Sequence, residues 1–180
     1  GMYRSNSVAS TINQKDLDEE YIKQSKILHI SGISQGISQS CNTAVLEAVK
    51  LAKSHNLLVS YDPNFREYLW KNISDAKYAM DEILEYTDII FPSHPGDTEK
   101  LLRITDPDDI YNYFKSWNVP TVILKCGEKG AIAYIENKKY TIPPIAPYGI
   151  IDVTGAGDTF VGTYLHCINN NIETKEALKW

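Results

Sequence analysis

The stretch Asp152-Val153-Thr154-Gly155-Ala156-Gly157-Asp158-Thr159-Phe160 is the most informative part of this chain. Its Gly155-Ala156-Gly157 turn has little side-chain bulk, so successive N–H groups can converge on one anion. An apolar helical pattern follows at residues 161–168, and a helix N-terminus adds partial positive charge at the same place. The sequence therefore predicts an anion-binding turn with the Asp158 carboxylate beside it.

This stretch resembles the second signature of the ribokinase-like (pfkB) family of carbohydrate kinases. The resemblance implies that Asp158 deprotonates the sugar hydroxyl that attacks the γ-phosphate of ATP. It also implies that the N–H groups of Gly155, Ala156, Gly157 and Asp158 bind the anion. The alternative is that the glycines only make a tight turn, with Asp158 as a helix cap. In some relatives the aspartate at the position of Asp152 helps to bind a monovalent cation, although a helix-entry role also fits it.

The composition is that of an ordinary globular domain. The chain has 180 residues, of which 43% are hydrophobic and 23% charged, so residues 1–180 are expected to form one α/β unit without a second domain. The net charge of −5 is spread along the chain, and nucleic acid is therefore not an expected partner. No stretch approaches the roughly 20 apolar residues of a membrane span, and the chain starts without a signal-peptide pattern, which predicts a cytoplasmic protein without membrane contact.

The cysteines and histidines show no spacing typical of a metal site or a disulfide framework. They are Cys41, Cys126 and Cys167, and His29, His55, His94 and His166. We predict reduced, structural cysteines and assign no catalytic or metal-binding role to the histidines.

Apolar runs rich in β-branched residues alternate with helical patterns, which predicts βαβ units and a mainly parallel sheet. Strands are expected at residues 26–30, 57–61, 88–91 and 121–125, followed by an antiparallel hairpin at 131–135 and 138–142. Helices are expected at 43–55, 75–86 with Ser74 as the cap, 97–103, 106–117 and 161–168, with a loop at 31–40. The resemblance implies the same class, a ribokinase-like, three-layer α/β/α (Rossmann-like) fold.

The loop Asp62-Pro63-Asn64-Phe65-Arg66 follows the second predicted strand. Ligands gather beyond the carboxyl ends of strands in such sheets. The loop resembles the family segment whose arginine reaches the acceptor sugar or the transferring phosphate. This implies that Arg66 is catalytic and that Asp62, Asn64 and Arg66 contact the substrate, work that suits a permanently charged, bidentate guanidinium. The alternative is a surface turn with a solvated Arg66.

The segment from Leu124 to Ala131, which contains Gly-Glu-Lys-Gly, resembles the family's strand and glycine loop beside the nucleotide. Such a turn is acceptable in any protein, so it indicates a nucleotide only together with the anion-binding turn. The ATP-binding residues implied by the resemblance are Lys125, Gly127, Gly130, Ser93 and Thr154.

Many family members carry an Asn-x-x-Glu motif, which influences magnesium and phosphate, after the third strand. The matching stretch here is Ser93-His94-Pro95-Gly96, which lacks both residues. Asp97 and Glu99 lie nearby, but neither stands at the expected position. ATP and Mg²⁺ are still the implied cofactors, because nucleotide phosphates hold much of the Mg²⁺ coordination shell. No protein metal ligand is assigned.

The N-terminal Met2-Tyr3-Arg4 resembles the region of 2-keto-3-deoxygluconate kinases in which a Tyr-Tyr-Arg strand contacts the acid sugar. The match implies that Arg4 pairs with the substrate carboxylate and that Tyr3 hydrogen-bonds or stacks on the sugar. The alternative is a frayed terminus.

Together, these resemblances imply ATP-dependent phosphorylation of a sugar or sugar-acid hydroxyl, with C6 of 2-keto-3-deoxygluconate as the first expectation. The alternatives are a fructokinase or ribokinase-type enzyme, and a nucleotide-binding module without chemistry. The resemblance covers the middle and later part of a typical member. We therefore expect a fragment without the lid region and the last helices, whose own activity is open. Uncovered sheet surface would then favour a homo-oligomer.

Overall fold

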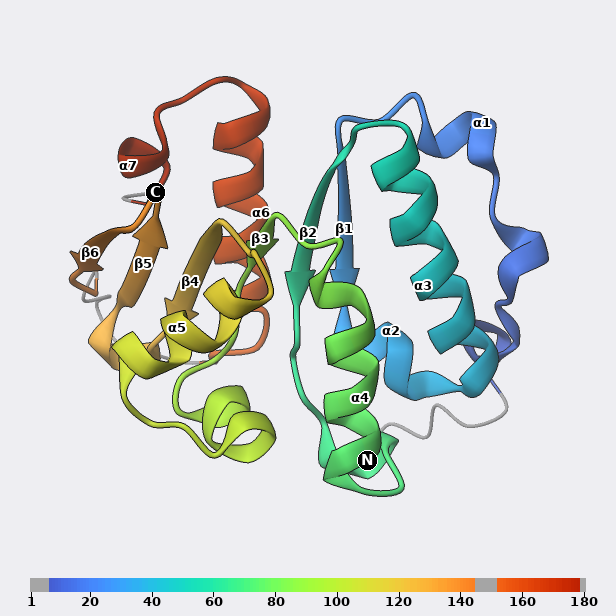
Figure 1. Cartoon of the computed structure of the whole chain (residues 1–180), viewed down its shortest axis with the longest axis horizontal. Coiled ribbons are helices and arrows are strands. Elements are labelled where there is room, and N and C mark those ends of the chain that lie inside the picture. The colour runs from blue at the N-terminus through green and yellow to red at the C-terminus, as the bar shows by residue number, and fades with distance from the viewer. Residues whose placement is uncertain (1–6, 145–151, 179–180) are drawn as a thin grey trace.

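The computed structural model describes residues 7–144 and 152–178 of the chain. Its strands form one sheet in the order β1-β2-β3-β4-β5-β6 (Figure 1). They are β1 (Ile27–Ser31), β2 (Leu58–Asp62), β3 (Ile89–Ile90), β4 (Thr121–Lys125), β5 (Ala131–Ile135) and β6 (Lys138–Ile142). Strands β1 to β4 are parallel, whereas β4, β5 and β6 are antiparallel neighbours. The predicted mainly parallel sheet with a hairpin at one side is confirmed.

Helices cover both faces of this sheet (Figure 1). They are α1 (Glu19–Ile22), α2 (Gly32–Ile37), α3 (Gln39–Ser54), α4 (Ile73–Leu84), α5 (Pro107–Ser116), α6 (Ala156–Asn169) and α7 (Thr174–Ala177). A π-helix spans Thr98–Leu102, and short 3-10 turns span Val8–Thr11, Gln14–Asp16, Glu67–Leu69 and Gly127–Lys129. None of the helices in the described ranges is long and apolar enough to cross a membrane.

The pleat of the central strands divides the core into two parts. Ile90, Val122 and Leu124 pack into the larger core together with α3, α4 and α5. Ile89 and Ile123 belong to the smaller core, which α6 and α7 complete on the opposite face. Successive strand side chains point to opposite faces, so both layers of helices bury apolar residues from the same strands. The three-layer arrangement of the prediction is therefore confirmed.

The predicted loop at residues 31–40 is wrong, because a short helix occupies most of it. Helix α2 begins after Ser31, whose hydroxyl accepts the Ile33 N–H at 3.3 Å. Helix α3 then begins earlier than residue 43, because the Ser38 hydroxyl accepts the Cys41 N–H at 3.1 Å. These serine caps are local hydrogen bonds, which the periodicity of apolar residues cannot predict.

Other predicted boundaries also shift at caps. Helix α4 begins at Ile73 with Asn72 as its cap, which accepts the Asp75 N–H at 2.8 Å, so Ser74 is not the cap. Helix α6 begins at Ala156 rather than at residue 161, directly after the glycine turn. Helix α5 lies within the predicted range 106–117, and it begins at Pro107 with Asp106 as its cap.

Candidate functional site

The turn before α6 presents unpaired backbone amides. Gly155 caps the helix with φ of 78°, a left-handed conformation that glycine adopts without strain. The Ala156 N–H donates to the Val153 carbonyl at 3.2 Å, so the turn itself uses this group. The N–H groups of Gly155, Gly157 and Asp158 donate to no described residue. Ala156 therefore uses its N–H within the turn, and the binding of an anion by the predicted amides stays a prediction.

A cavity of about 610 Å³ lies on one side of this turn, and we call it the β4–α6 cavity. Its lining includes Ala156 and Gly157 from the start of α6. It also includes Lys125 at the end of β4, together with Gly127 and Gly130 from the loop that follows. The structure thus gathers three of the five residues predicted to bind ATP at the glycine turn.

A second cavity, of about 460 Å³, lies between β1 and α6, and we call it the β1–α6 cavity. Its lining contains two residues predicted to contact substrate, Asp158 and Asn64. Gly157 lines the first cavity and Asp158, the next residue in the chain, lines the second. Asp158 is exposed, and its carboxylate accepts no hydrogen bond from a described residue. The glycine turn therefore forms the boundary between the two cavities.

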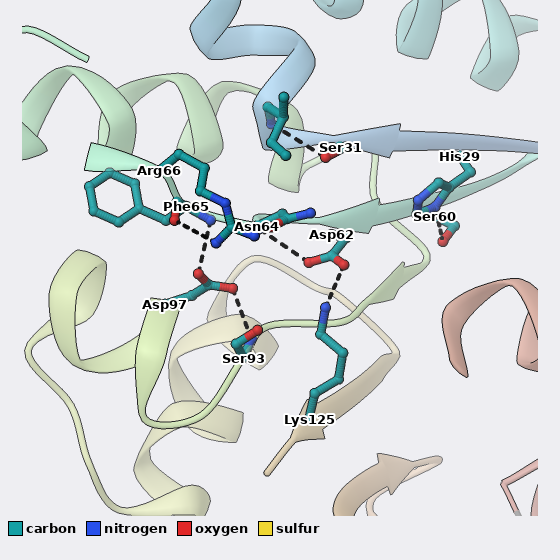
Figure 2. A network of polar contacts seen from close by, with 11 residues as sticks. His29, Ser31, Ser60, Asp62, Asn64, Phe65, Arg66, Ser93, Asp97 and Lys125 are labelled. Carbon is teal, nitrogen blue, oxygen red and sulfur yellow. Dashed lines mark hydrogen bonds and ion pairs between the residues drawn. The ribbon is translucent and has the colours of Figure 1, made fainter. Parts of the chain in front are cut away.

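The ion pair of Lys125 and Asp62 lies beside this boundary (Figure 2). The Lys125 ammonium donates to Asp62 Oδ2, and the two side chains are 13% and 2% exposed. A Cβ atom added at Gly157 would lie 3.5 Å from Lys125 Nζ, so the ammonium stands next to the glycine turn. Burial raises the pKa of Asp62, and the charge of Lys125 opposes that rise. The pair places a cation within reach of an anion bound at the turn.

Asp97 is a buried carboxylate whose role the sequence did not reveal. Its Oδ1 accepts the Phe65 N–H and its Oδ2 accepts the Ser93 N–H, both at 2.9 Å (Figure 2). Asp97 therefore ties the loop after β2 to the loop after β3. Each oxygen accepts one backbone N–H, which fixes the Asp97 carboxylate in place between the two loops. Within residues 7–144 and 152–178, no group of three or more His, Cys, Asp or Glu side chains is arranged to hold a metal ion.

Several predicted site residues lie outside both cavity linings. Arg66 is exposed, and its guanidinium contacts only the Phe65 carbonyl at 3.4 Å among the described residues. The Thr154 N–H donates to Asp152 Oδ1 at 2.8 Å in an exposed turn, and this bond lowers the pKa of Asp152. Neither Arg66 nor Thr154 lines the β4–α6 cavity or the β1–α6 cavity, so their roles stay predictions.

The remaining predicted residues occupy different places. Ser93 pairs with Lys125 as an isolated parallel bridge, and its N–H is held by Asp97. Tyr3 and Arg4 lie outside the described residues.

His29, to which the sequence assigns no catalytic role, lines a cavity. It lines the β1–α6 cavity together with Asp158, and its Nδ1 lies 3.0 Å from Ser60 Oγ. Desolvation and the charge of Lys125 lower the pKa of His29, whereas Asp158 raises it. No motif marks this histidine; only its place two residues before Ser31 on the same strand could have suggested a shared face.

Nearly the whole chain is similar to known proteins of one family. The family described as pfkB family carbohydrate kinase matches residues 2–180. A 2-dehydro-3-deoxygluconokinase from Thermoproteus tenax is 29% identical over 98% of this chain and 53% of its own length. Fructokinase-2 from Oryza sativa subsp. japonica is 32% identical over 99% of this chain and 54% of its own length.

A solved structure gives the same picture. A protein assigned as ribokinase II from E. coli, in complex with ATP and Mg²⁺, has a TM-score of 0.86 and 31% identity. The match covers 96% of this chain and 55% of that chain. This chain therefore spans about half the length of the relatives that it matches.

Proposed function

Because the chain belongs to the pfkB family of carbohydrate kinases, we propose that the protein transfers the γ-phosphoryl group of ATP to a hydroxyl of a sugar or sugar acid. The single observation that carries this proposal is the division between Gly157 and Asp158, which are consecutive residues that line different cavities. The β4–α6 cavity takes ATP and the β1–α6 cavity takes the acceptor. The reacting hydroxyl and phosphate then meet at the glycine turn.

The residues of the β4–α6 cavity fit a triphosphate. Its volume of about 610 Å³ lies within the range typical of small-molecule sites. The N–H groups of Gly155 and Gly157, which have no acceptor in the described part of the chain, and the N-terminus of α6 favour an anion at the turn. Lys125 adds a compact positive charge from the end of β4. The E. coli protein in complex with ATP and Mg²⁺ supports the same assignment of nucleotide and metal.

The described residues offer Mg²⁺ no group of three or more His, Cys, Asp or Glu side chains. This agrees with a magnesium ion that is coordinated mainly by phosphates and water. Bound in that way, Mg²⁺ would neutralise charge on the phosphate oxygens. Asp62 stays paired with Lys125 and orients that cation toward the turn.

The chemical role of Asp158 follows from its position. Its carboxylate accepts the proton of the acceptor hydroxyl as that oxygen attacks the phosphate, which makes Asp158 the general base. The N–H groups at the turn stabilise charge on the transferred group, since they are fixed in place before the reaction. Most of the rate enhancement then comes from holding the hydroxyl and the phosphate in line.

For the acceptor, we propose 2-keto-3-deoxygluconate, on the strength of the Thermoproteus tenax relative. The rice fructokinase supports fructose as the second candidate. A panel of 2-keto-3-deoxygluconate, fructose and ribose, with ADP release as the measurement, separates these acceptors. We expect sugar-dependent ADP release from the wild-type protein and its loss in Asp158→Asn. ATP binding without sugar-dependent turnover would instead favour the nucleotide-binding module.

A further inference from the structure

His29 shares a cavity with the proposed base. It lies on β1 opposite Ser60 of β2 in the parallel register, and it lines the β1–α6 cavity with Asp158 and Ser31. Residues two apart on a strand face the same side, so His29 and Ser31 reach the cavity from one edge of the sheet. The remaining wall includes the apolar Val161 and Leu165 of α6. The other polar side chains of this lining are Ser31, Ser34, Asn64 and Asp158, and the His29 ring is the imidazole among the groups that can orient a sugar.

Ser60 determines which ring nitrogen carries the proton. Ser60 is fully buried, and its hydroxyl has no other hydrogen-bond partner among the described residues than His29 Nδ1 at 3.0 Å (Figure 2). A buried hydroxyl hydrogen without an acceptor is costly, so the Ser60 O–H donates to Nδ1. The neutral ring must then carry its hydrogen on Nε2.

A lowered pKa favours the neutral form of the His29 ring near pH 7, and the ring is accessible to solvent at the edge strand. Desolvation and the positive charge of Lys125 lower the pKa of His29 below its ordinary value of 6.5, and Asp158 acts only in the opposite direction. Nε2 has no partner among the described residues. His29 thus offers one N–H donor whose orientation is held through Ser60.

We propose that His29 is a substrate-contacting residue, which donates a hydrogen bond from Nε2 to a hydroxyl or carbonyl oxygen of the acceptor sugar, with Ser60 as its positioning residue. This inference rests on the proposed function, because it requires the acceptor to occupy the β1–α6 cavity. A neutral donor selects an oxygen by position rather than by charge. His29 therefore contributes to where the sugar sits beside Asp158, and it does not recognise an acidic group as such.

Kinetics of matched variants test this contact. In His29→Leu we expect the KM for 2-keto-3-deoxygluconate to rise about 3–10-fold while the KM for ATP stays unchanged. His29→Gln should lose less, because its amide can place a donor near the position of Nε2. Ser60→Ala should raise the same KM by an intermediate factor. The control is His55→Leu. His55 lies at the end of α3, where its ring pairs with Glu19, and it is not part of the lining of the β1–α6 cavity. An unchanged acceptor KM in His29→Leu would overturn the proposal.

A measurement that is independent of turnover separates this inference from the proposed function. Imidazole ¹⁵N spectra of the histidine-labelled protein, with the His29 signals identified by His29→Gln, should show the Nε2–H tautomer. Addition of 2-keto-3-deoxygluconate should shift the Nε2 signal. A shift without any phosphorylation would support the contact and refute phosphoryl transfer. Phosphorylation without a shift, or an Nδ1–H tautomer, would refute the contact and leave the kinase assignment standing.

Discussion

Lys125 and Asp62 form a buried ion pair that crosses the end of β3, because β3 lies between the strands that carry them. Lys125 lines the β4–α6 cavity, and Asp62 begins the loop that carries Asn64 into the β1–α6 cavity. The Asn64 N–H donates to Asp62 Oδ1 at 3.1 Å, so Asp62 also shapes that loop. One pair of charges thus links the ATP side of the proposed site to the acceptor side.

Removal of the proposed base should abolish most of the activity. In Asp158→Asn we expect kcat to fall by roughly 10²–10⁴, because an amide cannot accept the hydroxyl proton. ATP affinity, measured by calorimetry, should change little, since Gly157 and Lys125 line the other cavity. Asp109→Asn, an exposed substitution on α5, is the matched control. Wild-type kcat in Asp158→Asn would refute the general-base assignment.

The Lys125–Asp62 pair should be strongly coupled. Lys125→Met leaves the Asp62 carboxylate buried without its partner, which we expect to cost about 3–5 kcal/mol of unfolding free energy. Asp62→Asn also destabilises, because Lys125 is then the unpaired charge. Denaturant unfolding of both single variants and of the double variant measures the coupling. The double variant should lose less than the sum of the single losses, and strict additivity would argue against the pair.

Two glycines of the same segment should respond in opposite ways to alanine. Gly155→Ala forces a residue with a Cβ atom into φ of 78°, so we expect a loss of about 1 kcal/mol. Gly162→Ala lies inside α6 with open space around the new Cβ, and it should gain about 0.5–1 kcal/mol. Thermal or denaturant unfolding compares them directly. Equal effects would show that the left-handed turn is not required.

Asp97 should hold the two loops together. Asp97→Ala leaves the amides of buried Phe65 and half-buried Ser93 without their acceptor, which we expect to cost about 1–3 kcal/mol for the buried amide and less for the other. Asp97→Asn keeps one acceptor oxygen and should lose less. Hydrogen exchange at these two amides should accelerate more than at β5, which the clamp does not touch. Unchanged protection of Phe65 and Ser93 would contradict the clamp.

Histidine titration should make the protein less stable in mild acid. The pKa values of His29 and His94 are lowered from 6.5 in the folded state, chiefly by desolvation. The unfolded chain therefore binds more protons as the pH falls below 6.5, and the unfolding free energy decreases in that window. His29→Gln should reduce this slope and His29→Gln/His94→Gln should reduce it further, as followed by denaturant unfolding. A slope unchanged in both variants would contradict the lowered pKa values.

Strand pattern and family resemblance were enough to predict most of the fold. The apolar runs that form β2 and β4 alternate with segments of helical hydrophobic periodicity. These patterns involve only residues close in sequence, so they can be recognised without knowledge of the tertiary structure. The turn residues 136–137 between two apolar runs likewise predicted the hairpin of β5 and β6. The prediction was wrong for a short polar segment, α2, because single serine side chains cap helices through hydrogen bonds that leave no hydrophobic periodicity in the sequence.

The sequence alone determined the features that depend on residues close in the chain. These are the glycine turn before α6, the carboxylate of Asp158 that follows it, and the alternation of strands and helices. Folding was needed to bring distant residues together, such as Lys125 beside Asp62 and His29 beside Asp158. It also left Arg66 outside both cavities. The physical reason is that a motif reports bonds between neighbours in the chain. Cavities, ion pairs and tautomers depend on which strand ends the sheet places side by side.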